Sequence, residues 1–70
     1  MAIYEVRNHR NDIWDEDNSK RRFSTRPPAD ELFEEEAQRG RFVRLIRWHD
    51  YELTELRRFE GQPQGQRAPG

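Results

Sequence analysis

The side chains that could carry out catalysis in this 70-residue chain are few, and no motif gathers them. Cysteine is absent, so two histidines, two serines and two threonines are the candidates for nucleophilic or base chemistry. An activated serine needs a base, a group that orients the base, and a shaped pocket. Acidic pairs such as Asp15 with Asp17, or Glu34 with Glu35, could exchange protons, but runs of carboxylates are typical of solvated surfaces. The sequence therefore predicts a protein that is not an enzyme.

A possible set of metal ligands occurs in the polar segment that follows residue 8. His9 and Asp12, with Asp15 and Asp17 nearby in sequence, offer nitrogen and oxygen donors. A structural zinc site usually uses cysteine or several histidines, and a calcium loop uses regularly spaced acidic residues with a glycine. Neither pattern is present here. We therefore expect no metal and no other cofactor, and interpret these residues as part of a solvated loop.

Arginine and aromatic residues occur together in two segments, residues 20–26 and 39–47. Phe23, Phe42 and Trp48 lie within or beside these segments. On a sheet, such residues could stack on bases and contact phosphates, as in proteins that bind single-stranded nucleic acid. The net charge of -1 and the acidic residues between 30 and 36 count against a surface that follows phosphates. A small single-stranded nucleic-acid-binding protein is therefore the alternative function.

The octapeptide RFVRLIRW, residues 41–48, carries bulky apolar groups and arginine on both faces of the strand that it predicts. We expect Val43 and Leu45 to face a helix, which leaves the even-numbered residues on a face that one helix cannot cover. Exposed apolar groups indicate association, and tryptophan and arginine dominate binding energy at interfaces. The opposite orientation stays open, although it turns Arg44 inward. The sequence predicts binding of a larger protein through Arg41, Phe42, Arg44, Ile46, Arg47 and Trp48.

The elements that must position these residues follow from hydrophobic periodicity and turn residues. Residues 2–9 alternate as a first strand, and 21–25 predict a second strand that ends before two prolines. Between them, a long polar turn is expected to fold Ile13 and Trp14 back onto the domain. Residues 29–39 predict a helix with Gly40 as its C-terminal cap. Two further strands, 41–48 and 53–59, are expected to be joined by a loose turn, since no Asn-Gly or Asp-Gly pair is present.

Together these elements predict an α+β fold with the order ββαββ, in which one helix packs on a mainly antiparallel sheet of three or four strands. Two alternatives stay open: ββαβα, in which residues 50–60 form a helix, and an all-helical chain. Residues 1–61 form the single domain in this interpretation. Residues 62–70, rich in proline, glycine and glutamine, predict a disordered C-terminal tail.

Composition restricts the class of protein further. Only 31% of the residues are hydrophobic and 39% are charged, with a mean hydropathy of -1.37. A domain of this length has room for a modest core, and no disulfide can reinforce it. No apolar run is long enough for a membrane span. The sequence therefore predicts a cytoplasmic protein without a membrane partner, and it does not specify an oligomeric state.

The order of elements over residues 2–60 resembles that of small proteins that bacteriophages make to disable host machinery. The resemblance lies in a short strand, the lead-in Phe23-Ser24-Thr25, an acidic helix and an arginine-rich strand. RNA polymerase inhibitors and anti-CRISPR proteins are examples of such proteins. The resemblance implies a noncatalytic inhibitor that occupies a surface of a larger host enzyme. It rests on architecture, so no functional residue is carried over from it.

Overall fold

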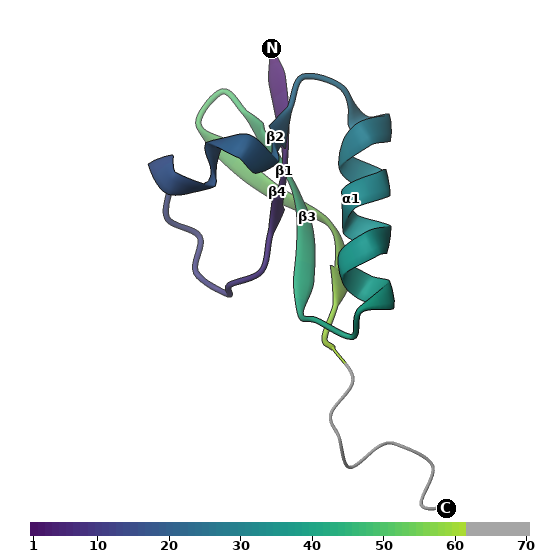
Figure 1. Ribbon diagram of the computed structural model, residues 1–70. Helices are drawn as coiled ribbons and strands as arrows, with labels where there is room; N and C mark the ends of the chain where they lie inside the picture. The colour runs from purple at the N-terminus through teal and green to yellow at the C-terminus, as the bar shows by residue number, and fades with distance from the viewer. Residues whose placement is uncertain (62–70) are drawn as a thin grey trace, which may run out of the picture.

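The computed structural model describes residues 1–61, and the predicted tail at 62–70 lies outside the described residues. Four strands form a single antiparallel sheet, and one α-helix packs on one side of it (Figure 1). This arrangement confirms the predicted ββαββ fold. The sheet order is β2-β1-β3-β4. Because residues 43–49 and 52–59 are strands, both helical alternatives are wrong. The elements are β1 (Ala2–Arg7), the 3-10 helix η1 (Glu16–Arg21), β2 (Arg22–Phe23), α1 (Arg26–Gln38), β3 (Val43–His49) and β4 (Glu52–Phe59).

The two faces of the sheet are covered by different parts of the chain (Figure 1). Helix α1 covers one face. The segment that joins β1 to β2, residues 8–21, lies against the other face and includes η1. We call residues 8–21 the strap. The molecule therefore has three layers, because the long polar turn expected from the sequence returns over the sheet.

The apolar core lies between α1 and the sheet. Val43 and Leu45 of β3 are fully buried there, as predicted, and they pack with Val6 of β1 and Phe33 of α1. Burial of each such side chain contributes roughly 1.5–3 kcal/mol relative to exposure. Further side chains that are partly buried against this cluster are Tyr4, Phe23, Leu32, Ala37, Leu56 and Phe59.

Helix α1 begins at Arg26, three residues before the predicted start. Pro27 and Pro28 occupy its first turn. N–H groups there have no acceptor within the helix, so the N–H that proline lacks costs no hydrogen bond, and the fixed φ of proline suits the helix. The helix ends as expected, because Gly40 follows it in the left-handed region with φ 75°. No helix within residues 1–61 is long and apolar enough to cross a membrane.

Strands β3 and β4 are joined by a tight turn of two residues, Asp50 and Tyr51. His49 pairs directly with Glu52, and both turn residues have positive φ, 52° and 65°. This is the backbone of a type I′ hairpin turn, whose twist matches that of the strands it joins. The expectation of a looser turn was therefore wrong: the strand pairing enforces a conformation that the residue types do not favour.

Candidate functional site

The sheet face opposite α1 is not the open surface that the sequence predicts. The strap covers it, so that Arg44 is 4% exposed and Ile46 is fully buried. Of the even-numbered residues of β3, only Trp48 keeps substantial contact with solvent. The orientation of the strand was predicted correctly. The expected exposure of Arg44 and Ile46 was wrong, because the strap lies over them along a path that the sequence did not predict.

Arg44 holds the first part of the strap in place. Its guanidinium donates to a carboxylate oxygen of Asp12 at 2.7 Å and to one of Glu55 at 2.7 Å. It also donates to the backbone carbonyls of Arg10 and Asn11, each at 3.2 Å. Burial alone would lower the pKa of Arg44, but the bonds to Asp12 and Glu55 raise it above its usual value. The charge is therefore retained in the interior, where partners are required to compensate for lost hydration.

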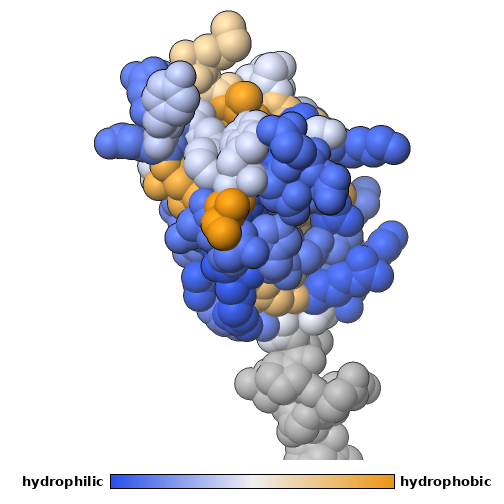
Figure 2. All heavy atoms as spheres, turned by 90° about the vertical axis from the view of Figure 1, so that its left-hand side faces the viewer, coloured by the Kyte–Doolittle hydropathy of each residue, from blue (hydrophilic) through white to orange (hydrophobic). Residues whose placement is uncertain are grey.

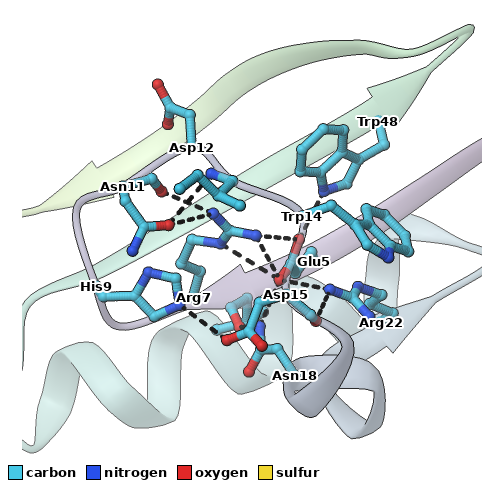
Figure 3. A network of polar contacts seen from close by, with 12 residues as sticks. Glu5, Arg7, His9, Asn11, Asp12, Trp14, Asp15, Asn18, Arg22 and Trp48 are labelled. Atoms are coloured by element: carbon cyan, nitrogen blue, oxygen red, sulfur yellow. Dashed lines mark hydrogen bonds and ion pairs between the residues drawn. The ribbon is translucent and has the colours of Figure 1, made fainter.

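Charged and polar side chains fill the space between the sheet and the strap, and we call them the polar layer. Glu5 lies at the centre of a second group of contacts in this layer (Figure 3). Its fully buried carboxylate accepts hydrogen bonds from Asn18 of the strap at 2.5 Å and from the indole of Trp48 at 2.6 Å. Arg7 and Arg22 form ion pairs with it at 3.1 and 3.4 Å. Burial raises the pKa of Glu5, but the bonds from Asn18, Trp48 and Arg7 outweigh that effect and hold the pKa below its usual value. Glu5 thus joins the sheet, the strap and Trp48 through one anionic group.

The other predicted site residues do not form one surface. Arg41 precedes β3 and pairs with the buried carboxylate of Glu36 at 3.2 Å. Phe42 is half-buried, with the guanidinium groups of Arg10 and Arg58 at 3.9 and 5.6 Å from its ring centroid. Arg47 is exposed, but strand alternation places it on the α1 side of the sheet. Trp48 lies at the opposite end of β3 from Phe42.

Trp48 instead belongs to an aromatic hollow at the end of the molecule where β1 begins and β3 turns into β4. Its ring meets that of Trp14 from the strap edge-to-face, with centroids 5.1 Å apart. The hollow has a volume of about 540 Å³. Figure 2, which faces the strap, shows apolar and weakly polar side chains gathered at the upper end of the molecule. The residues that line the hollow are Met1, Ile3, Trp14, Trp48, His49, Asp50 and Tyr51.

Contacts around its ring hold Trp14 in position beside the hollow. The guanidinium of Arg22 lies 3.8 Å from the ring centroid, and the indole N–H donates to Glu16 at 2.7 Å. Trp14 nevertheless remains 42% exposed. The sequence correctly predicts that Trp14 folds back onto the domain, whereas Ile13 is 72% exposed. The hollow is therefore pre-formed and open to solvent.

Tyr51 stands at the rim of the hollow with its side chain fully exposed. Its φ of 65° is unusual for a bulky residue, since the left-handed conformation costs roughly 1–2 kcal/mol in residues other than glycine. Asp50 tolerates this region better, because its short polar side chain can bond locally. A strained turn that presents an exposed aromatic ring is the kind of backbone outlier that points to function.

The possible metal ligands of the strap do not converge. Asp12 pairs with Arg44, whereas the imidazole Nε2 of His9 lies 3.5 Å from a carboxylate oxygen of Asp15. Within residues 1–61, no three histidine, cysteine or acidic side chains are grouped so that they could hold a metal ion.

The features expected of a nucleic-acid surface are dispersed over the molecule. Phe23 packs against the core beneath α1, so it does not share a face with Trp48. Most arginines in the two basic segments are paired with acidic side chains. These pairs are Arg22 with Glu5, Arg26 with Asp30, Arg41 with Glu36, and Arg44 with Asp12 and Glu55.

Of the residues that line the hollow, the sequence identifies only Trp48 as functional, and Trp14 and Tyr51 are the aromatic residues that it misses. One signal was available for Trp14, a large aromatic residue within an otherwise polar segment. Tyr51 carries no such signal, because its exposure depends on the turn. In comparisons with known proteins, no family model matches the sequence, and no curated protein or solved structure is significantly similar to it.

Proposed function

We propose that this protein is a noncatalytic protein-binding module that attaches to a larger protein through the aromatic hollow. The observation that carries the proposal is the pre-formed hollow between Trp14, Trp48 and Tyr51, which is apolar, open and rimmed by a fully exposed tyrosine. Tryptophan and tyrosine are the residues that most often concentrate binding energy at interfaces. A contiguous apolar surface of this kind on a small, highly charged domain is typical of an interaction site.

The mechanism in this proposal is steric. A side chain of the partner enters the hollow, and the module then covers part of the partner's surface. The resemblance to phage-encoded inhibitors supports a role in the cytoplasm as an inhibitor of a larger host enzyme, such as RNA polymerase or a CRISPR effector. The small core and the use of both sheet faces for internal packing are compatible with a module that acts by contact alone.

Single-stranded nucleic-acid binding is the rival function, and the electrostatics of the molecule disfavour it. Arginines already paired with carboxylates would have to break those pairs before they could neutralise phosphates. Trp14 and Trp48 could stack on bases, but Glu16 and Asp50 beside them would repel a phosphate chain.

The proposal is tested by affinity capture from host extract with the full chain, followed by binding measurements with the purified partner. We expect Tyr51→Ala and Trp14→Ala to weaken binding at least tenfold, because interface aromatics commonly contribute more than about 1.4 kcal/mol each. Arg47→Ala is the matched control, since Arg47 is exposed on the other side of the sheet. The captured enzyme should lose activity when the wild-type protein is added.

Two results would contradict the proposal. One is unchanged partner affinity in both aromatic variants, with the circular dichroism spectrum and thermal unfolding of each variant like those of the wild type. The other is a titration in which short single-stranded DNA or RNA binds at low salt and is released as salt is raised.

A further inference from the structure

The rim of the aromatic hollow is acidic. Asp50 lines the hollow, its side chain is 81% exposed, and its ion pair is with His49, itself half-exposed. Glu16 is exposed and accepts the indole N–H of Trp14. Glu16 forms no ion pair with lysine or arginine within the part of the chain that the structure describes.

Other carboxylates on the strap side of the molecule are paired with arginines. Glu55 binds Arg44 and Arg58, and Glu60 binds Arg10 and Arg58. Arg22, which lies over the ring of Trp14, is directed to Glu5, and its side chain is only 8% exposed. The negative charge at the rim is therefore uncompensated by the protein's own arginines.

From this combination we infer that the hollow receives an apolar side chain carried on a basic segment of the partner protein, whose lysines or arginines pair with Glu16 and Asp50. The inference rests on the proposed function and specifies the chemistry of the partner. An apolar anchor fits the lining of Met1 and Ile3 and the two indoles. A volume of about 540 Å³ lies within the ~300–1,000 Å³ typical of ligand pockets, so the hollow accommodates a large side chain.

Charge complementarity at the rim has a defined physical effect. Exposed ion pairs add little affinity individually, but they favour the correct partner, speed association and repel acidic partners. Burial of the apolar side chain in the hollow supplies most of the binding free energy. The carboxylates favour partners in which that side chain is flanked by lysine or arginine. Binding should therefore weaken with salt without being abolished, since the apolar part is not screened.

The test is selection of a random peptide library on the immobilised full-length protein, with Tyr51→Ala and Trp14→Ala used to discard peptides that bind elsewhere. We expect the retained peptides to carry a large apolar residue flanked by lysine or arginine. The fluorescence of Trp14 and Trp48, the two tryptophans of the chain, reports binding of each synthetic peptide directly.

A neutralised rim provides the decisive comparison. The double variant Glu16→Gln, Asp50→Asn keeps side-chain size and polarity while removing the charges. We expect it to bind the selected peptides about three- to tenfold more weakly and to select a library without enrichment of basic residues. Arg47→Gln, a charge change on the other side of the sheet, should leave both results unchanged.

The outcomes separate this inference from the proposed function. Peptides that depend on the hollow but lack basic residues, or that bind the double variant equally well, would overturn the preference for basic segments. The hollow would then remain a binding site without that preference. A library that yields no peptide sensitive to Tyr51 or Trp14 overturns the inference. The proposed function itself fails if the purified native partner is also insensitive to those two substitutions.

Discussion

The indole Nε1 of Trp48 donates a 2.6 Å hydrogen bond to Oε1 of Glu5, while the other carboxylate oxygen of Glu5 accepts from Asn18 of the strap (Figure 3). One buried carboxylate thus orients Trp48, which lines the hollow, and holds the strap, which carries Trp14 on the other side of the hollow. The shape of the proposed binding site therefore depends on a carboxylate that is itself fully buried.

The first prediction concerns this carboxylate. Glu5→Ala should lower the free energy of unfolding by about 3–5 kcal/mol, because Arg7 and Arg22 would be left buried without their anionic partner. Glu5→Gln should cost less, since its amide still offers an oxygen to Trp48 or Asn18. Urea unfolding followed by circular dichroism measures both. Glu31→Ala, an exposed change on α1, is the control, and equal stability of all variants would contradict the structure of the polar layer.

The second prediction is the pH dependence of stability. The pKa of Glu5 is held below its ordinary 4.5 in the folded protein, and the hydrogen bond from Arg44 also lowers the pKa of Glu55. A carboxyl with a lowered folded pKa stabilises the protein above its unfolded pKa, and this contribution is lost as pH falls through the folded pKa. We expect the melting temperature to fall as pH drops below about 4.5.

Glu5→Gln removes one of these groups, so its melting temperature should depend less steeply on pH in the acidic range. Glu31→Gln should retain the wild-type slope. A melting temperature that rises on acidification would show that these carboxyls have raised rather than lowered pKa values.

The third prediction distinguishes a buried arginine from a surface arginine on the same strand. Arg44→Glu would place a carboxylate beside Asp12 and Glu55, so we expect the strap to detach and the domain to lose most of its stability. Arg47→Glu, an exposed change three residues later, should change the free energy of unfolding by less than about 0.5 kcal/mol. Thermal unfolding and limited proteolysis of the strap measure the difference. A native-like Arg44→Glu protein would restore the open sheet face predicted from the sequence.

The fourth prediction concerns the strained turn. Tyr51→Gly should stabilise the hairpin by about 1 kcal/mol, because glycine adopts positive φ without steric cost. The same change should abolish partner binding, since the exposed ring is lost. Tyr51→Ala keeps the backbone strain and removes the ring, so it should lose binding without a gain in stability. A Tyr51→Gly protein that is less stable than the wild type would show that the ring supports the fold.

The sequence determined the elements that depend on local periodicity and on burial of one apolar face. The preferred prediction of the helix, the four strands and the inward direction of Val43 and Leu45 followed from side-chain spacing. The same spacing left two other folds and the opposite orientation of residues 41–48 open. The start of α1 was placed too late, since two prolines were taken to end a strand although they also suit a first helical turn.

Tertiary structure alone decided the candidate site. The path of the strap depends on contacts between residues far apart in the sequence, such as Arg44 with Asp12 and Trp48 with Glu5, and no local pattern encodes such pairs. The turn at Asp50 and Tyr51 likewise follows from the register of two strands rather than from its own residues. Long-range pairing of charged side chains closed the face expected to be open, and it left the proposed binding surface at the end of the sheet.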